Sequence, residues 1–377
     1  MPNWLISILG AIYTRIPVSI RPYVKRVFNW GVLRIQAIVS RRRVHQGQQV
    51  QFLDFEIAHL EPYEFLSPSN GEVLIKAQFS CISPGTERAV LCGLPGARRD
   101  FPYAPGYAVA GRLLAAGKGV GNLKVGDRVA GRMPHADLAT VSARHLFKIP
   151  HQVTDQEACF IELGIICLQG IRKAGIQPGD VVAVVGQGLI GQLANRLAKM
   201  LGAARVVAIA PSHNREKTAL LPGGADEFLA FNDDDVSLAD VQADIVIEAV
   251  GSPDANLTAL ECAKDKGRVV LLGSTRGLTR NLNLAGLVQR RELTIVGAHI
   301  NAMPEHDAGP QRWTYWQEGR LFLDLLANQR LSVADLITWQ AAPTECNAVY
   351  ENLAQGGRGQ VGVVFDWRDS NTSKSAA

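Results

Sequence analysis

Residues 181–191 read Val181-Val182-Ala183-Val184-Val185-Gly186-Gln187-Gly188-Leu189-Ile190-Gly191, and the architecture of this 377-residue chain can be worked out from them. The first five residues form a short apolar run of the kind found in a strand buried on both faces of a parallel sheet. Apolar residues then recur with helical period from Leu193 to Leu201. The stretch predicts a strand, a glycine-rich turn and a helix in succession, which is the setting that a dinucleotide-binding turn requires.

The three glycines of this turn each have a physical reason to be glycine. Gly186 permits a tight turn, Gly188 lets the backbone approach a pyrophosphate, and Gly191 lets the helix pack closely on the strand. A diphosphate would then meet the unpaired N–H groups at the start of the helix, around Leu189 and Ile190, where the helix dipole also favours an anion. The alternative is a glycine-rich turn that holds no ligand.

The pattern of the rest of the chain predicts an α/β protein built from two lobes. Short β segments broken by Gly and Pro give way near residue 151 to alternating strands and helices, which implies parallel βαβ units and a doubly wound parallel sheet. The predicted organisation is a basic N-terminal extension at 1–45, a β-rich domain at 46–150, a nucleotide-binding domain at 151–300, a return segment completing the β-rich domain at 301–366, and a flexible polar tail at 367–377.

Two further turns are expected to lie beside the glycine-rich one. The predicted strands of the parallel sheet are Val181–Val185, Arg205–Ala210, Ile245–Val250, Val269–Leu272 and Leu293–Val296. Gly251 follows the third of these strands, and Gly273 and Ser274 follow the fourth. Because ligands of open α/β sheets bind beyond the carboxyl ends of the strands, these three residues are placed to line a cofactor cleft.

The N-terminal extension is strongly basic. No acidic residue precedes Asp54, whereas eight bases do: Arg15, Arg21, Lys25, Arg26, Arg34, Arg41, Arg42 and Arg43. Apolar residues recur among them at roughly helical spacing, which predicts a basic amphipathic helix able to lie on an anionic membrane surface. The alternatives are packing on the body of the protein or a partner subunit, and an organelle transit segment. No stacking aromatics or base-reading motif accompany the charge, so nucleic acid is not expected as a partner.

The six cysteines favour a reduced, cytoplasmic location. They lie far apart, at positions 81, 92, 159, 167, 262 and 346, and form no Cys-x-x-Cys pair. Neither a zinc ribbon nor a disulfide framework is therefore indicated. With the basic extension, this predicts a cytoplasmic protein, with a peripheral position on the inner face of a membrane as the alternative.

Three motifs carry a family resemblance, which covers residues 46–366. They are Ser83-Pro84-Gly85-Thr86-Glu87, Pro105-Gly106-Tyr107 and the stretch from Ile300 to Trp316. With the order of the domains, they resemble the medium-chain dehydrogenase/reductase (alcohol dehydrogenase-like) superfamily and, within it, the group that contains bacteriochlorophyllide a dehydrogenase. The resemblance implies a GroES-like catalytic domain, a Rossmann domain that binds NAD or NADP, and a homodimer.

The metal ligands of zinc-dependent members of that superfamily are largely replaced here. By the resemblance, Ser83 stands in place of a cysteine and Tyr107 in place of a histidine, and only Glu162 is retained as a carboxylate. A catalytic zinc needs three good protein ligands and an open position. No cysteine lies between Cys92 and Cys159, so the four-cysteine structural zinc lobe is missing as well. We therefore expect no metal.

Three side chains are candidates for proton transfer in a zinc-free site. Tyr107 would face the nicotinamide, and its phenol can donate to a developing alkoxide if its pKa is shifted towards the working pH. Thr86 matches the hydroxyl residue that relays a proton in zinc-dependent relatives. Glu162 would be a carboxylate with no cation beside it, placed to orient Tyr107 or to act as the base. The alternatives are an aromatic packing role for Tyr107 and a buried carboxylate satisfied by backbone N–H groups for Glu162.

Four nearby polar residues receive no catalytic role from the sequence. Ser83 is interpreted as an inert remnant, and Glu87 as a neighbour that hydrogen-bonds the site from outside. Arg132 and His135 follow a short predicted strand; they either reach the pocket or, as polar residues in loops usually do, meet solvent.

The second strand of the nucleotide-binding domain favours NADP. An NAD-preferring site places an acid at the end of this strand to hold the ribose hydroxyls. Ala210 stands there instead, and Ser212 and Arg215 follow it. A small residue leaves room for a 2′-phosphate, and an arginine can pair with it through charge-assisted bonds. The alternative is an Arg215 that faces solvent, and the subgroup resemblance itself points to NAD.

Together these observations predict a zinc-independent NAD(P)-dependent oxidoreductase that interconverts a secondary alcohol and a ketone in the cleft between the two domains. The substrate would be a small molecule, with a hydrophobic ring alcohol and a polyol-like metabolite as the two classes. Two alternatives remain. One is a quinone or enone reductase of the same fold, which needs less acid–base chemistry. The other is a nucleotide-binding scaffold at the membrane that has lost catalysis.

Overall fold

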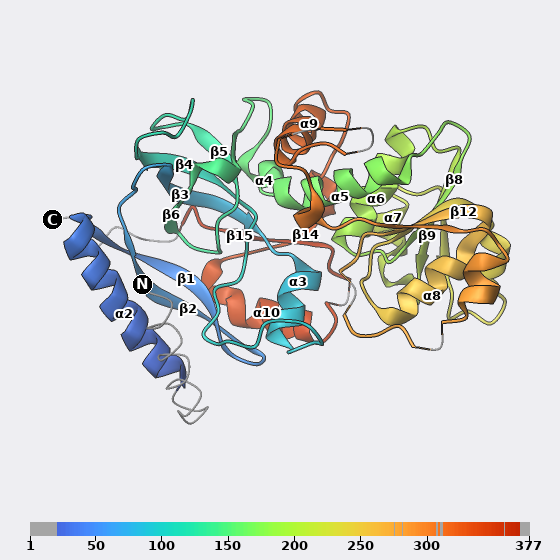
Figure 1. The fold of residues 1–377 in the computed structure, drawn as a ribbon, viewed down its shortest axis with the longest axis horizontal. Coiled ribbons are helices and arrows are strands. Elements are labelled where there is room, and N and C mark those ends of the chain that lie inside the picture. The colour runs from blue at the N-terminus through green and yellow to red at the C-terminus, as the bar shows by residue number, and fades with distance from the viewer. Residues whose placement is uncertain are drawn as a thin grey trace.

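The computed structural model describes residues 21–274, 276–280, 282–306, 308–309, 312–357 and 359–369, apart from the side chains of residues 21–23 and 26. In this part of the chain a β-rich lobe and an α/β lobe lie side by side, with a long helix along the outside of the β-rich lobe (Figure 1). The predicted fold class is confirmed.

The α/β lobe is built on a six-stranded parallel sheet with the strand order β10-β9-β8-β11-β12-β13. The chain starts in the middle of the sheet, runs to one edge and returns to fill the other, as in a doubly wound dinucleotide-binding fold. The strands are β8 (Val181–Val185), β9 (Arg205–Ala210), β10 (Glu227–Ala230), β11 (Ala243–Glu248), β12 (Ala263–Leu271) and β13 (Thr294–Gly297). The helices of this lobe are α5 (Ile161–Ala174), α6 (Leu189–Met200), α7 (Glu216–Ala219) and α8 (Pro253–Cys262).

Strand β8 shows why its sequence is apolar without interruption. Val182 and Val184 pack into one core cluster, which includes side chains of α5 and α6, and Ala183 and Val185 pack into a second cluster with side chains of α8. Successive side chains of a strand point to opposite faces, so both faces of β8 are covered. The predicted bounds of β8 and β9 are confirmed, whereas the edge strand β10 was not predicted.

The β-rich lobe holds a seven-stranded sheet and a separate hairpin. The sheet order is β14-β15-β3-β4-β5-β7, with β6 also paired to β3, and β1 pairs with β2. The strands are β1 (Val44–Asp54), β2 (Ile57–Leu66), β3 (Glu72–Cys81), β4 (Val109–Ala116), β5 (Arg128–Gly131), β6 (Leu138–Ser142), β7 (Leu146–Lys148), β14 (Ile337–Ala341) and β15 (Gly362–Asp366). The helices are α3 (Pro84–Leu91), α4 (Asp155–Ala158), α9 (Tyr315–Ala327) and α10 (Cys346–Ala354).

The C-terminal segment returns into the β-rich lobe and pairs there with β3. Strand β15 pairs antiparallel with the end of β3. Trp367, which follows it, is fully buried, and its indole N–H donates to Oγ of Ser80 at 2.9 Å. Placing Trp367 in a flexible tail was therefore wrong, because its large apolar ring completes the core next to β3. Residues 370–377 of the predicted tail lie outside the described residues.

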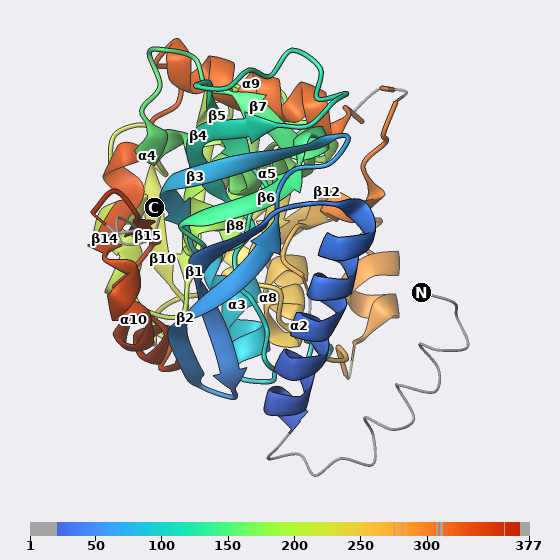
Figure 2. The same cartoon turned by 90° about the vertical axis from the view of Figure 1, so that its left-hand side faces the viewer.

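Helix α2 (Arg21–Ser40) is the described helix of the N-terminal extension, and residues 1–20 lie outside the described residues. The helix runs along the hairpin of β1 and β2 at the outer edge of the molecule (Figure 2). A salt bridge of 2.7 Å joins Arg34 to Glu64 of β2. None of the described helices combines the length and the apolarity needed to cross a bilayer.

Candidate active site

In the glycine-rich turn between β8 and α6, neighbouring atoms pack closely against Gly186 and Gly191, whereas the space over Gly188 is open. Gly186 has a φ of +94°, and a Cβ there would lie 2.3 Å from Cγ2 of Val250. A Cβ on Gly191 would lie 1.8 Å from the carbonyl oxygen of Gly186, so α6 packs too closely on the turn for any side chain. Over Gly188 the nearest atom is a nitrogen of Arg215, 3.8 Å from the position of a Cβ. This open backbone next to the first N–H groups of α6 fits a diphosphate.

The other predicted cofactor turns meet at the same edge of the sheet. A Cβ on Gly251, which has a φ of +77°, would lie 2.6 Å from the carbonyl oxygen of Ser274. Between them lies Glu248, the last residue of β11, which sequence reasoning missed. Its Oε1 accepts from the N–H groups of Val250 and Gly251 at 2.7 Å each, and its carbonyl oxygen accepts from the N–H of Gly273 at 2.8 Å. Burial raises the pKa of this carboxyl. Glu248 therefore holds together, through hydrogen bonds, the two turns that border the predicted cofactor cleft.

Arg215 does not face solvent, contrary to the alternative drawn from the sequence. Its Nε and Nη2 donate to the backbone carbonyls of Gln360 and Gly357, at 3.1 and 3.3 Å, and burial lowers the pKa of the guanidinium. No carboxylate pairs with it in the part of the chain that the structure describes. The Ser212 side chain is exposed and makes no capping bond. A partly buried cation with no carboxylate partner among the described residues thus lies beside the open turn.

Tyr107 belongs to a cluster of hydroxyl groups in front of β4. Its phenol donates to Oγ of Ser83 at 2.6 Å, and the Thr86 hydroxyl bonds the same phenol. Ser83 is the N-cap of α3 but caps no N–H with its side chain, so its oxygen serves Tyr107. The interpretation of Ser83 as an inert remnant stays a prediction, since this contact shows only that its side chain bonds Tyr107. Burial raises the pKa of Tyr107 more than the two hydroxyls lower it. The phenol therefore keeps its proton, and its pKa is shifted away from the working pH.

Glu162 bonds Arg132 and Tyr315 rather than Tyr107. Nε of Arg132 donates to its Oε2 at 3.0 Å, and the Tyr315 hydroxyl donates to its Oε1. Burial raises the pKa of Glu162, and the hydrogen-bonded guanidinium and phenol oppose that rise. Expecting a carboxylate with no cation beside it was wrong, because the loop after β5 directs Arg132 to the first turn of α5 instead of to solvent.

Arg132 is a partly exposed cation with unused hydrogen-bond donors. Its side chain is 38% exposed, and its guanidinium carbon lies 4.9 Å from the centroid of the Tyr315 ring. Burial lowers its pKa, but the charge and hydrogen bond of Glu162 outweigh burial and hold the pKa above its ordinary value. A guanidinium carries five N–H donors, and its bonds to Glu162 and Tyr315 use only part of them. The group is therefore permanently charged and able to bind a further oxygen.

Helix α5 places this cluster close to the glycine-rich turn. Glu162 lies in its first turn, and Sγ of Cys167, on the same helix, donates to the carbonyl oxygen of Ile190 at the start of α6. That contact measures 3.7 Å. Five residues of helix span about 7.5 Å. Glu162 and the residue of α5 that contacts the start of α6 are thus close along the same helix. This places the Arg132–Glu162 pair near the candidate diphosphate site.

The side chains at the three zinc positions of the resemblance bond to one another or to a cation. Ser83 and Tyr107 are hydroxyl groups bonded to each other, and Glu162 is paired with a cation. Neutral hydroxyls are poor zinc ligands, and a catalytic zinc needs three good ones. Among the residues that the structure describes, no group of three or more His, Cys, Asp and Glu side chains is close enough to hold a metal ion.

A buried network lies behind the hydroxyl cluster. Glu87 accepts from the N–H of Ser83 at 2.8 Å and from the Tyr350 hydroxyl at 2.5 Å, and it lies 3.2 Å from Nε2 of His135. Nδ1 of His135 lies 2.8 Å from Oγ of Ser80. Expecting His135 to meet solvent was wrong, because the ring is fully buried. The predicted hydrogen-bonding role of Glu87 is confirmed, and the network fixes the start of α3 and with it Ser83.

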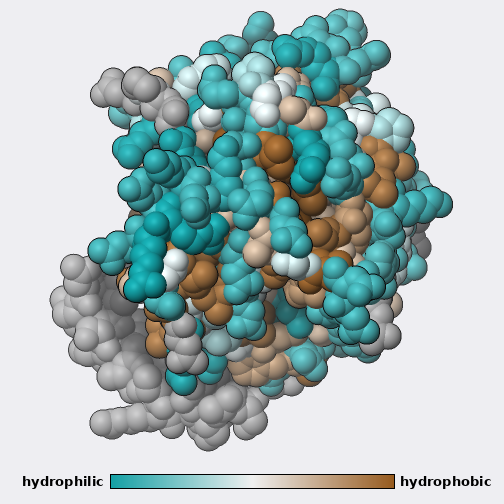
Figure 3. All heavy atoms as spheres, turned by 90° about the vertical axis from the view of Figure 1, so that its right-hand side faces the viewer, coloured by the Kyte–Doolittle hydropathy of each residue, from teal (hydrophilic) through white to brown (hydrophobic). Residues whose placement is uncertain are grey.

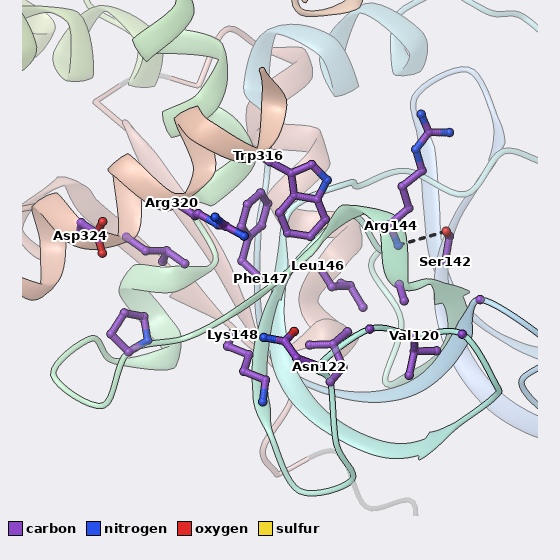
Figure 4. Close-up of a pocket in the computed structure, with 17 residues that line it drawn as sticks. Val120, Asn122, Ser142, Arg144, Leu146, Phe147, Lys148, Trp316, Arg320 and Asp324 are labelled. Carbon is purple, nitrogen blue, oxygen red and sulfur yellow. Dashed lines mark hydrogen bonds between the residues drawn. The ribbon is translucent and has the colours of Figure 1, made fainter. Parts of the chain in front are cut away.

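A surface pocket of about 490 Å³ lies elsewhere in the β-rich lobe. The loop at 119–123, β7 and α9 line it, and Figure 4 shows Trp316 and Phe147 on one wall. Two of its cations are paired with acids, Arg144 with Glu305 at 2.6 Å and Lys148 with Asp127 at 2.7 Å. None of the predicted catalytic or cofactor residues lines this pocket, so it is not assigned to the site.

Comparisons with known proteins agree with this arrangement of lobes. The model of the alcohol dehydrogenase GroES-like domain matches residues 69–151, and that of the zinc-binding dehydrogenase matches residues 190–313. Over 241 residues the chain is 30% identical to D-guloside 3-dehydrogenase of Escherichia coli strain K12, covering 62% of this chain and 68% of that one. Over 275 residues it is 24% identical to (R,R)-butanediol dehydrogenase of Bacillus subtilis strain 168, covering 64% and 78%.

The fold is also that of solved dehydrogenases. A proposed zinc-binding dehydrogenase from Sinorhizobium meliloti 1021, bound to NADP, superposes with a TM-score of 0.71 at 21% identity, over 85% of this chain and 99% of that one. Galactitol-1-phosphate dehydrogenase from Escherichia coli gives the same TM-score, identity and coverage. With its two domain matches and a relative at 30% identity, the chain belongs to the medium-chain dehydrogenase/reductase superfamily and is an oxidoreductase of that family.

Proposed function

We propose that this chain is a zinc-independent, NAD(P)-dependent oxidoreductase that interconverts a secondary alcohol and a ketone where its two lobes meet. The observation that carries the proposal is the Arg132 guanidinium, which forms a salt bridge with Glu162. By the resemblance, Glu162 stands at a position where zinc-dependent relatives carry a metal ligand. A fixed cation with free N–H donors can stabilise the oxyanion that develops on a carbonyl during reduction. The relatives named as butanediol and guloside dehydrogenases support an alcohol or its ketone as the substrate.

The nucleotide would be held by the carboxyl edge of the parallel sheet. The open backbone at Gly188 and the N–H groups of Leu189 and Ile190 would bind the diphosphate. The turns at Gly251 and at residues 273–274 would border the rest of the dinucleotide. When bound, this cofactor supplies the hydride donor or acceptor.

The chain's own residues would orient the carbonyl and provide its proton. Burial keeps the Tyr107 phenol protonated and makes it a weaker acid, but the alkoxide that forms during ketone reduction is basic enough to take its proton. Ser83 and Thr86 touch the phenol and would return a proton to it. Glu162 acts as a positioning residue, since it holds Arg132 and does not reach Tyr107.

We favour NADP over NAD as the cofactor. Arg215 supplies a cation without a carboxylate partner beside the open turn, and Ser212 offers an uncommitted hydroxyl. Charge-assisted bonds from such groups suit a 2′-phosphate. The NADP-bound neighbour from Sinorhizobium meliloti is consistent with this choice.

We also propose a homodimer, in a cytoplasmic protein placed peripherally on the inner face of a membrane. Strand β13 is one edge of the parallel sheet, and Ile295 on it is 41% exposed. Apolar atoms interrupt the hydrophilic surface of the α/β lobe when the right-hand side of Figure 1 faces the viewer (Figure 3). Unpaired strand edges of this kind can pair with a second copy.

The test combines a metal assay with turnover. Full-length protein is treated with a chelator, its zinc content is measured, and nicotinamide absorbance is followed with panels of cyclic ketones, polyol-derived ketones, enones and quinones. We expect ketone reduction to persist without zinc. Activity that disappears with the metal and returns with added Zn²⁺ would overturn zinc independence.

Tyr107→Phe then separates the alternatives. A secondary-alcohol enzyme loses most of its ketone turnover, because the phenol supplies the proton. Full turnover of enones or quinones by this variant would instead identify a conjugated double-bond reductase. Nucleotide binding with no hydride exchange over the whole panel would favour the scaffold.

A further inference from the structure

Helix α2 turns its most apolar face away from the body of the protein. The large apolar side chains that it exposes on this face are Val24, Val27, Phe28, Ile35, Ile38 and Val39, here called the outer stripe. They recur at spacings of three and four residues, with one gap around Gly31, and so share one face of the helix. Ile35, Ile38 and Val39 are 64, 78 and 80% exposed. An amphipathic helix that simply packed on its own protein would bury such a face.

The contacts of α2 hold it in this orientation. Leu33 and Ala37, which lie opposite the outer stripe on the helix, are only partly exposed. Arg34 is fixed to Glu64 of β2, and Nζ of Lys25 donates to the carbonyl oxygen of Pro102 at 3.1 Å. The helix is therefore attached through its inner side and flanks, and the outer stripe is left exposed. The helix itself lies at the edge of the molecule (Figure 2).

The surroundings of the outer stripe are basic. No acidic residue occurs before Asp54, and Arg41 and Arg43, just beyond the end of the helix, are exposed. Among the described residues, neither of these two arginines forms an ion pair. Trp30, 56% exposed, stacks with Arg34 at 5.4 Å on one flank of the stripe. Aromatic and basic side chains bordering an apolar face are the composition of helices that lie in a membrane interface.

We propose that the outer stripe of α2 inserts into the surface of an anionic lipid bilayer, with the helix axis parallel to the membrane. The apolar face meets the acyl boundary, while the arginines meet acidic headgroups. A second copy of this chain is the less suitable occupant, because two such segments would bring their bases together with no acidic residue to pair them. The β-rich lobe is then held at the membrane through the hairpin of β1 and β2.

Vesicle binding by the full-length chain tests this proposal. The probes are vesicles of phosphatidylcholine alone and of phosphatidylcholine with phosphatidylglycerol, in flotation experiments at low and high salt. We expect binding to the anionic vesicles only, weakened by salt. Brominated acyl chains should quench tryptophan emission, and Trp30→Phe should remove most of that quenching.

Two double variants with equal charge change supply the decisive comparison. Ile35→Glu with Ile38→Glu alters the outer stripe, and Asn29→Glu with Gln36→Glu places the same charge on exposed positions beside it. We expect the stripe variant to lose at least tenfold in vesicle affinity and the control variant to lose much less. Nucleotide binding and thermal unfolding should match the parent in both, which separates this result from any failure of the proposed enzyme activity.

Equal binding by the two double variants would overturn the proposal. So would a parent protein that ignores anionic vesicles but forms dimers that the stripe variant cannot form, because the occupant would then be a second copy.

Discussion

The glycine-rich turn and the Arg132 cluster are built in opposite ways. The turn is formed by residues close together in the sequence, and it depends on glycines because a side chain would not fit. A Cβ on Gly191 would lie 1.8 Å from a backbone oxygen. The cluster takes Arg132 from the loop after β5, Glu162 from α5 and Tyr315 from α9, and it depends on charged and polar atoms that are present. Local steric constraints can be read along a sequence. Electrostatic partners separated by many residues are found only once the chain has folded.

Gly191→Ala is expected to have the largest effect, because it places a methyl group where the glycine-rich turn has no room for one. The new methyl group must push α6 away from the turn, and overpacking costs about 1–3 kcal/mol or more. We expect nucleotide affinity to fall by about 100-fold, equivalent to about 3 kcal/mol, together with a lower Tm. Fluorescence titration with NADPH and NADH and thermal unfolding measure both.

Gly188→Ala is the matched control for this change. The space over Gly188 is open, so its methyl group should leave the Tm unchanged and weaken only nucleotide binding. A Gly191→Ala protein with parental affinity and Tm would show that the packing of α6 on the turn does not set the site.

Arg132→Met tests the electrostatic side and ranks second. Loss of a group that stabilises the oxyanion lowers kcat/KM for ketone reduction by about 10²–10³. Arg132→Lys should recover part of it, because lysine keeps the charge but not the planar fork of donors. Steady-state kinetics and nucleotide titration separate a loss of turnover from a loss of cofactor.

The control for Arg132 is Arg112→Met, which removes an equal charge from an exposed position on β4. It should leave kcat/KM at the parental value. If Arg132→Met behaves like this control, the cation has no part in the reaction.

Arg215→Gln is expected to have a smaller and selective effect. Losing one charge-assisted contact should weaken NADPH binding by about 10- to 100-fold, since such bonds contribute about 1.5–3 kcal/mol. NADH titrated into the same variant is the internal control and should bind as it does to the parent. An equal loss for both nucleotides would assign Arg215 to the contacts between the lobes rather than to a 2′-phosphate.

The smallest effect should come from pH acting on Glu162. Burial raises its pKa above the ordinary 4.5, so it takes up a proton at a higher pH than a free carboxyl. As the pH falls through that raised pKa, the ion pair with Arg132 is lost, and kcat/KM should decline along an acid limb that lies above pH 4.5. Glu162→Gln lacks the ion pair at every pH, so it should flatten this limb and hold kcat/KM at the low value that the parent reaches in acid. An acid limb that survives in the variant would belong to another group.

The sequence was sufficient for most of the parallel sheet and for the strand, glycine-rich turn and helix at residues 181–200. An apolar run followed by three spaced glycines has few physical solutions, and β8, β9 and α6 follow from it. Strand β10 was missed because Glu227 and Phe228 leave an edge strand partly exposed, without a continuous apolar run. The residues assigned to cofactor binding stay predictions, although the turns that hold them gather at one edge of the sheet.

The chemistry of the candidate site was only half predictable. Tyr107 and Glu162 were found from the positions of zinc ligands, but Arg132 resembles an ordinary loop cation in the sequence. Only the fold brings it to a carboxylate thirty residues later, at 3.0 Å. Trp367 was assigned to the tail for the same reason. Polar residues follow it in the sequence, and its hydrogen-bond partner, Ser80, lies on the distant strand β3.

The return of β15 to β3 has a consequence for synthesis on the ribosome. The six parallel strands of the α/β lobe emerge in one uninterrupted run, so this lobe can close while the C-terminal residues are still being translated. The β-rich lobe cannot complete its sheet at that stage. One edge of the Phe79–Cys81 end of β3 pairs with Val364–Asp366, which are translated near the end of the chain. Until then the nascent chain carries an unpaired strand edge, which is the kind of surface that chaperones protect from aggregation.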